Sequence, residues 1–250
     1  MNWLFLNSGK CDAAFNMALD EALLEAMPRL QAPVLRFYGW TQPAATFGYF
    51  QKFSEVEATT HLRPLIRRPT GGGIVPHDAD WTYSAAFPPG HEWHSLKAEE
   101  SYRRIHDWLR LAFMEMRVET ELAPCCKKPS LGSSRREEAH SKNAERLVTS
   151  SPTIPSACFI GHEKSDLLWC GKKIAGAAQR RNKLGLLIQG SVQPPPVSLA
   201  WEKFEAAMRA GAEKNFGVNW TEFSPDAGLQ AAAAKLSAEK FSQVCYNQKR

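Results

Sequence analysis

Residues 67–84 read RRPTGGGIVPHDADWTYS, with three consecutive glycines at 71–73 between β-forming runs at residues 65–68 and 81–87. This pattern predicts two short strands that flank a glycine-rich turn. Because glycine has no Cβ, backbone N–H groups in such a turn can approach a carboxylate, phosphate or thioester oxygen, and a preceding arginine can add charge-assisted hydrogen bonds. A wide hairpin turn that binds no ligand is the alternative interpretation. The P-loop pattern of nucleotide-binding proteins is absent.

Helices and further strands are predicted on both sides of this turn. Apolar spacing typical of helices occurs at residues 12–27, 98–116, 199–211 and 227–241. Strand-like runs occur at residues 34–38, 45–49, 157–159, 166–169, 173–179 and 186–192. In the first helix, Asp20, Glu21 and Glu25 are expected away from the apolar face. The order helix, strands, helix, strands, helices predicts an α+β fold with a mixed, largely antiparallel sheet flanked by helices.

The composition is that of an ordinary globular protein. The chain has 250 residues, of which 44% are hydrophobic and 23% charged, which excludes collagen-like and disordered classes. Neither a run of about 18 apolar residues nor a signal peptide is found, so we expect a cytoplasmic protein with no membrane partner. Six cysteines without a Cys-x-x-Cys pattern predict reduced thiols and no metal site. The net charge of +5 is modest for a nucleic-acid binder and fits acidic protein partners.

Lys173 and Cys158 are the candidate reactive side chains. Lys173 enters a predicted strand whose next residues are small, and a lysine buried there would need an anion, a carbonyl oxygen or a thiolate as its partner. A solvent-exposed lysine at a strand end is the alternative. Cys158 lies fifteen residues before Lys173, and a nearby ammonium could lower its pKa and activate it as a nucleophile. A cysteine that serves only as a small apolar side chain is the alternative.

Four sequence blocks together resemble the lipoate-protein ligase and octanoyltransferase superfamily. They are SGKCDAAFNMALDEALL (8–24), LRFYGWTQPAATFGYFQ (35–51), RRPTGGGIVPHDADWTYS (67–84) and GKKIAGAAQRRNKLGLLIQGSV (171–192). The chain is most similar to the cysteine-dependent octanoyltransferases of the LipM type. The resemblance implies a biotin/lipoate ligase-like catalytic domain over residues 1–197, with a mobile polar insert at 127–151. Residues 198–250 are expected to form a helical extension packed on the same domain.

The resemblance also assigns site residues. Cys158 is implied as the nucleophile and Lys173 as the residue that activates it. The implied substrate-binding residues line a tunnel for an eight-carbon acyl chain: Arg68, Thr70, Gly71, Gly72, Gly73, His77, Gly176, Ala177 and Gln179. One departure is Gln189, which stands where transferases of this type have a histidine.

The implied reaction moves an octanoyl group from acyl carrier protein, through a Cys158 thioester, to a lysine of a lipoyl domain. Acceptors would be the glycine cleavage H protein or the E2 subunit of 2-oxoacid dehydrogenases, and no metal or cofactor would be required. One alternative is ATP-dependent lipoate ligation, in which Lys173 binds the lipoyl-adenylate and Asp166 helps to hold Mg²⁺. Another, which Gln189 makes plausible, is a non-catalytic protein that binds acyl groups or lipoyl domains.

Overall fold

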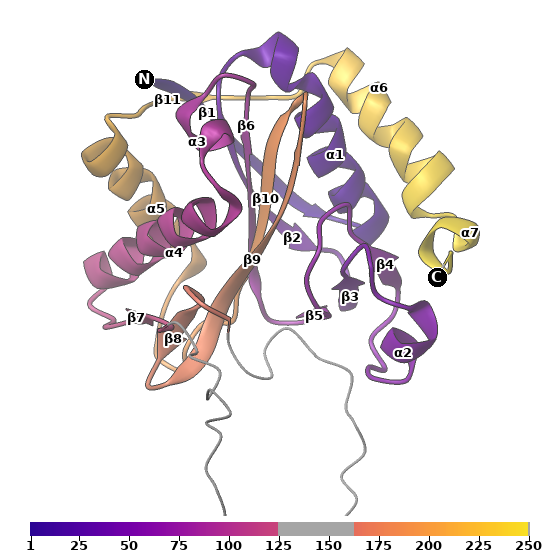
Figure 1. Cartoon of the computed structure of the whole chain (residues 1–250), viewed down its shortest axis with the longest axis horizontal. Coiled ribbons are helices and arrows are strands. Elements are labelled where there is room, and N and C mark those ends of the chain that lie inside the picture. The colour runs from indigo at the N-terminus through magenta and orange to yellow at the C-terminus, as the bar shows by residue number, and fades with distance from the viewer. Residues whose placement is uncertain (125–162, 250) are drawn as a thin grey trace, which may run out of the picture.

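The computed structural model describes residues 1–124 and 163–249 (Figure 1). Its strands are β1 Asn2–Cys11, β2 Val34–Trp40, β3 Ala44–Phe47, β4 Leu65–Arg67, β5 Val75–His77, β6 Trp81–Phe87, β7 Glu121–Leu122, β8 Leu167–Trp169, β9 Lys172–Asn182, β10 Gly185–Val192 and β11 Asn219–Glu222. Its helices are α1 Ala13–Leu30, α2 Phe53–Glu57, α3 Glu92–Ser95, α4 Ala98–Glu115, α5 Trp201–Phe216, α6 Ala227–Leu236, a π-helical turn Ser237–Phe241, and α7 Val244–Asn247.

A large twisted sheet forms the centre of the molecule. Within the described residues it has eight strands in the order β11-β1-β2-β6-β10-β9-β8-β7. The β11–β1 and β1–β2 pairs are parallel, and the other neighbours are antiparallel. The prediction of an α+β fold with a mixed, largely antiparallel sheet is therefore confirmed.

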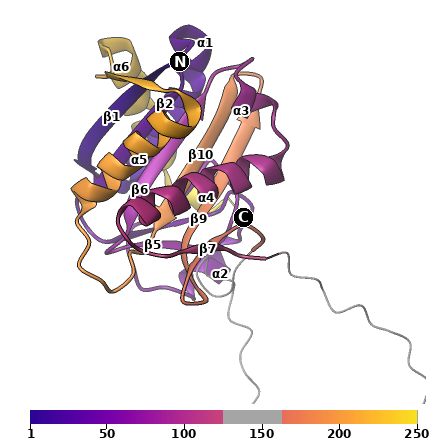
Figure 2. The same ribbon diagram turned by 90° about the vertical axis from the view of Figure 1, so that its left-hand side faces the viewer.

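Helices cover both faces of this sheet (Figures 1 and 2). Helices α4 and α5 pack on one face, where Trp108, Phe113 and Phe204 belong to the largest hydrophobic core. Helices α1 and α6 lie on the other face, where Leu23 and Leu229 belong to a second core. Burial of apolar surface from both sides holds the three layers together.

Helix α1 begins where the sequence predicts, but its polar side is largely buried. The Asp12 side chain accepts a hydrogen bond from the Phe15 N–H and caps the helix. Asp20 and Glu21 are buried, with exposures of 0% and 4%, whereas Glu25 is exposed. The expectation that all three acidic side chains face away from the core is thus wrong for Asp20 and Glu21, because both have cationic partners from distant segments.

The glycine-rich turn belongs to a second, smaller sheet of order β4-β3-β5. Strand β3 pairs with β4 in parallel and with β5 antiparallel, so β4 and β5 flank it instead of pairing with each other. The turn is therefore not a hairpin turn, and its binding of a ligand stays a prediction. The turn spans residues 68–74 between β4 and β5, and strand β5 was not predicted from the sequence.

The C-terminal part of the chain adds to layers that begin at the N-terminus. Strand β11, which was not predicted, pairs with β1, and α6 packs beside α1. The domain limit at residue 197 stays a prediction. Cys158, the strand predicted at 157–159 and the insert predicted at 127–151 all lie outside the described residues. None of the helices in the described ranges is long and apolar enough to cross a membrane.

Candidate active site

A cavity lies between α1, the small sheet and strands β9 and β10. Its lining residues are Met17, Tyr38, Thr46, Arg68, Val75, His77, Thr82, Gly176, Ala177, Ala178, Gln189, Gly190 and Ser191. The cavity volume is about 30 Å³, and a value of about 410 Å³ is reached only when the open space at its mouth is included. Four of the residues expected to bind substrate therefore meet here: Arg68, His77, Gly176 and Ala177.

The glycine turn is held in place by close backbone contact. A Cβ added at Gly48 would lie 1.9 Å from the carbonyl oxygen of Gly72, and Gly72 itself has a φ of +88°. Both positions therefore require glycine. Gly48 was not singled out from the sequence, where it lies inside the strand predicted at 45–49, and a glycine inside a strand was the available signal of close backbone contact.

Arg68 binds the turn from inside. Its guanidinium donates to the carbonyl oxygens of Gly71 at 2.6 Å and Gly73 at 2.9 Å, and to Thr46 Oγ1 at 3.1 Å. The expectation from the sequence was that an arginine here would donate to a ligand. In the structure these guanidinium N–H groups donate to carbonyl oxygens of the turn, which point inward, and so they fix the shape of the turn.

Lys173 is buried beside the cavity. Its Nζ lies 2.7 Å from Asp166 Oδ2, and the two side chains are only 6% and 8% exposed. A Cβ added at Gly176 would lie 2.8 Å from Lys173 Cε. The lysine side chain therefore packs directly against Gly176, a residue of the cavity wall. The alternative of a lysine exposed to solvent is therefore wrong. Asp166 supplies the anion that a buried lysine needs, and its Oδ2 also accepts from the Glu163 N–H at 2.7 Å.

His106 of α4 lies behind this pair and was not singled out from the sequence. The residue is 2% exposed, and neither ring nitrogen has a hydrogen-bond partner of good geometry in the described part of the chain. Burial lowers the pKa of His106 to about 4; the nearby Lys173 lowers it further, whereas Asp166 opposes the shift. The imidazole is therefore neutral at neutral pH.

His77 lies in a row of polar groups along the cavity wall. Its Nδ1 is 2.9 Å from Asp80 Oδ2, and its Nε2 is 2.8 Å from Thr46 Oγ1. Asp80 Oδ2 also accepts from the hydroxyls of Thr82 at 2.9 Å and Ser191 at 2.7 Å. The Asp80 carboxylate orients the imidazole and gives His77 a fixed position. Substrate binding by His77 stays a prediction.

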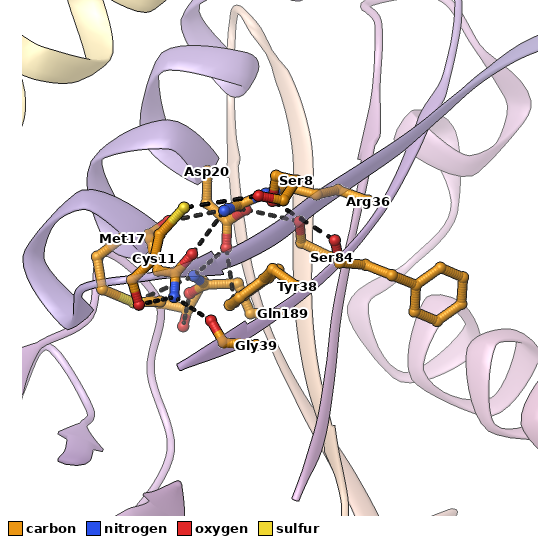
Figure 3. Close-up of polar contacts among 12 residues, drawn as sticks. Ser8, Cys11, Met17, Asp20, Arg36, Tyr38, Gly39, Ser84 and Gln189 are labelled. Carbon is orange, nitrogen blue, oxygen red and sulfur yellow. Dashed lines mark hydrogen bonds and ion pairs between the residues drawn. The ribbon is translucent and has the colours of Figure 1, made fainter. Parts of the chain in front are cut away.

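Gln189 connects the glycine turn to a buried network around Asp20 (Figure 3). Its Oε1 accepts from Thr70 Oγ1 at 2.7 Å, and its Nε2 donates to Asp20 Oδ2 at 2.7 Å. Asp20 forms an ion pair with Arg36 at 2.6 Å and accepts from the Tyr38 hydroxyl at 3.1 Å. Burial and the Asp20 charge raise the pKa of Tyr38 well above its usual value. Thr70, predicted to bind substrate, is thus engaged in this network.

Gln179 does not line the cavity. Its Oε1 accepts from Ser101 Oγ at 3.0 Å, and its Nε2 donates to the Ala98 carbonyl at 3.1 Å, so the side chain faces helix α4. It borders a separate surface groove together with Gly71. Within residues 1–124 and 163–249, no cluster of three His, Cys, Asp or Glu side chains forms a metal site.

Comparison with known proteins identifies the family. Residues 12–237 match the model described as the lipoyl protein ligase A/B catalytic domain. The octanoyltransferase LipM of Anoxybacillus flavithermus is 35% identical over 195 residues, which cover 76% of this chain and 64% of that protein. The chain therefore spans less than two thirds of the length of this curated relative.

Solved structures agree on the fold. A T. acidophilum protein with bound lipoic acid superposes with a TM-score of 0.75 at 18% identity, over 100% of both chains. The bi-partite lipoate protein ligase of Thermoplasma acidophilum, solved in a study with its E2 lipoyl domain, gives a TM-score of 0.72 at 16% identity, over 99% of this chain and 96% of that one. From the family match and the 35% identical relative together, the chain belongs to the lipoyl protein ligase A/B catalytic domain family.

Proposed function

We propose that this protein transfers an octanoyl group from acyl carrier protein, through a thioester on Cys158, to a lysine of a lipoyl domain. The buried Lys173–Asp166 pair beside the cavity is the observation that carries the proposal. A lysine buried at the wall of a cavity is suited to stabilise a thiolate or a developing oxyanion. The octanoyltransferase relative supports transfer as the reaction.

The transfer takes two steps. The Cys158 thiolate attacks the thioester carbonyl, the carbon–sulfur bond to the carrier breaks, and the carrier leaves as a thiol after it takes up a proton. The acceptor lysine, as a free amine, then attacks the Cys158 thioester; an amide forms, and its proton passes to the departing thiolate. Lys173 would stabilise the thiolate form of Cys158 in both steps.

Cys158 is close to Glu163 in the sequence. Four residues lie between them, and the backbone N–H of Glu163 donates to Asp166 Oδ2. Five steps of extended chain span at most about 18 Å, a length compatible with the proposed action of Cys158 beside Lys173.

The cavity would hold the acyl chain. Met17, Val75, Ala177 and Ala178 offer apolar surface, and Gly176 leaves room because it has no side chain. Burial of a methylene group contributes about 0.8 kcal/mol, so the depth of the cavity would select chain length. In this proposal Gly71, Gly72, Gly73 and His77 shape the wall around the chain.

Asp166 argues for transfer over ATP-dependent ligation. In the ligase alternative this carboxylate would help to hold Mg²⁺, but its Oδ2 already accepts from Lys173 and from the Glu163 N–H. A metal ion would have to compete with both partners for that oxygen. The Lys173–Asp166 contact thus fits a lysine held ready for acyl chemistry.

The test is the intact mass of the protein after mixing with octanoyl-acyl carrier protein without ATP. The proteins to compare are wild type, Cys158→Ala and the control Cys170→Ala, since Cys170 is an exposed free thiol. We expect one octanoyl group on wild type and the control but none on Cys158→Ala, and its release on addition of a lipoyl domain. The absence of an adduct on wild type would overturn the proposal. Lipoyl-domain modification that requires ATP and persists in Cys158→Ala would show ligation, and tight binding without an adduct or turnover would show a binding protein.

A further inference from the structure

The last residues of the chain, 238–249, lie beyond the family match, which ends at residue 237. This C-terminal segment nevertheless packs against the small sheet that carries the glycine turn. Phe241 has an exposure of 0% and belongs to a core cluster with Ile66 of β4 and Tyr38 of β2. Lys240 forms an ion pair with the buried Glu21 of α1. The segment is thus anchored on both sides of the site.

Asn247 completes the free edge of strand β4. Its Oδ1 accepts from the backbone N–H of Arg67 at 2.8 Å, as a neighbouring strand would. Its Nδ2 donates to the carbonyl oxygens of Phe241 at 2.8 Å and Gln243 at 3.2 Å. The residue is only 7% exposed, so loss of these bonds would leave buried polar groups without partners.

Arg67 ties the segment to the loop that follows β3. Its guanidinium donates to the carbonyl oxygens of Tyr49 at 2.8 Å and Gln51 at 2.7 Å on one side. On the other side it donates to the carbonyl oxygens of Tyr246 at 3.3 Å and Asn247 at 2.9 Å. Arg67 has an exposure of 0%. Because its guanidinium is planar and rigid, it holds the four carbonyl oxygens to which it donates at fixed distances from one another.

The side chains of Arg67 and Arg68, at the end of strand β4, point to opposite sides of the chain. Successive side chains of extended backbone point to opposite faces, and here Arg67 contacts the C-terminal segment while Arg68 donates to the carbonyl oxygens of Gly71 and Gly73. A shift of β4 at Arg67 would therefore move the glycine turn at the wall of the cavity.

We propose that Asn247 and Arg67 are positioning residues, through which the C-terminal segment sets the place of the glycine turn and so the affinity of the site for the acyl donor. The statement about the donor rests on the proposed function. The statement about the turn rests on the contacts of Arg67, Arg68 and Asn247 alone.

The first measurement is hydrogen–deuterium exchange of peptides that contain residues 68–74. The variants are Asn247→Ala and, as a matched control, Cys245→Ala, whose thiol is exposed on the same short helix. Asn247→Ala removes three hydrogen bonds, of which the one from the Arg67 N–H holds β4. From the loss of that bond we expect about five- to tenfold faster exchange in the turn, and no change for the control. Asn247→Asp keeps an acceptor for the Arg67 N–H but cannot donate to Phe241 and Gln243, so its exchange should fall between wild type and Asn247→Ala.

The second measurement is the rate of acyl-enzyme formation against the concentration of octanoyl-acyl carrier protein. Asn247→Ala should need about five- to tenfold more donor for half-maximal rate, with a maximal rate close to that of wild type. A lower melting temperature with unchanged turn exchange and unchanged donor dependence would overturn the positioning role. If wild type forms no acyl-enzyme, the proposed function fails, and turn exchange still decides the positioning role by itself.

Discussion

Among residues 1–124 and 163–249, two buried pairs of a carboxylate with an arginine or a lysine differ in their surroundings. Asp20 and Arg36 are 2.6 Å apart in the middle of the large sheet, and both side chains are 0% exposed. Asp166 and Lys173 are 2.7 Å apart near its far edge, with side chains that are 8% and 6% exposed. The first pair uses arginine, whose charge is permanent, whereas the second uses lysine, which can give up and regain a proton.

The partners of each pair show what it does. Arg36 also donates to the Asn16 carbonyl at 3.0 Å, to Asn16 Oδ1 at 2.7 Å and to Ser8 Oγ at 2.9 Å, while the Ser84 hydroxyl donates to Asp20 Oδ1 at 2.6 Å. This network ties β1, α1, β2 and β6 together. Lys173 instead lies over Gly176, a wall of the cavity. The contacts of the first pair are those of a structural network, and the second pair is the one to which the proposed function assigns a chemical role.

Removal of Arg36 should have the largest effect on stability. Arg36→Leu leaves Asp20 buried without its cation, and we expect a loss of about 3–5 kcal/mol in the free energy of unfolding, measured by denaturant titration. The control is Arg29→Ala, because the Arg29–Asp226 pair is 57% and 52% exposed and should contribute at most about 1 kcal/mol. Equal small losses in the two variants would contradict a structural role for the Asp20 network.

Removal of Lys173 should have a large effect on activity. Lys173→Ala is expected to slow acyl-enzyme formation by about 100- to 1000-fold, since the thiolate and the oxyanion lose their cation. Lys172→Ala, at the exposed neighbouring position, should react like wild type. Lys173→Arg keeps the charge but meets the limited space over Gly176, so it should restore little activity. Wild-type rates in Lys173→Ala would remove this lysine from the mechanism.

His106, which lies near the Lys173–Asp166 pair, should make the free energy of unfolding depend on pH. This effect on stability should be smaller than that of Arg36→Leu. The pKa of His106 falls from 6.5 to about 4 on folding, mainly through burial. The unfolded chain then binds a proton that the folded chain does not, so stability is complete above pH 6.5 and is lost as pH falls toward 4. Between pH 7 and pH 5, the unfolding free energy of wild type relative to His106→Phe should fall by about 2 kcal/mol. A difference that stays constant over this range would contradict a neutral buried imidazole.

Much of the fold was predictable because local patterns carry it. Helix α1 has its Asp12 cap, and strands β9 and β10 contain the small and apolar runs at residues 174–178 and 185–188. Strands β1, β5, β7 and β11 were not predicted. Strands β5, β7 and β11 have only two to four residues and are defined by their partners, whereas β1 has ten residues, Asn2–Cys11, and its second half is the polar run Asn-Ser-Gly-Lys-Cys. Pairing over long sequence distances leaves little trace in a single segment.

The site was predictable in its residue types but not in its contacts. The small residues after Lys173 left a buried lysine and an exposed lysine as alternatives, and the structure shows the buried one, with Asp166 as a partner that the sequence analysis did not assign to it. Arg68 was expected to bind a ligand, and its guanidinium donates to the carbonyl oxygens of its own turn and to Thr46 Oγ1. Asp20 was expected on a polar face of helix α1. It is buried instead, because its partner Arg36 comes from strand β2, which the helical pattern alone does not reveal. Partners brought together by tertiary structure decide the role of a charged residue.

The parallel pairing of β1 with β11 affects how the chain assembles during synthesis. Asn2 pairs with Asn219 at the edge of the large sheet, so the ribosome must make residues 2–219 before this side of β1 gains its neighbour. Until then a strand that contains Trp3, Leu4 and Phe5 presents an open edge to other nascent chains. Low temperature and slow expression, which reduce encounters between incomplete chains, should therefore raise the yield of native protein.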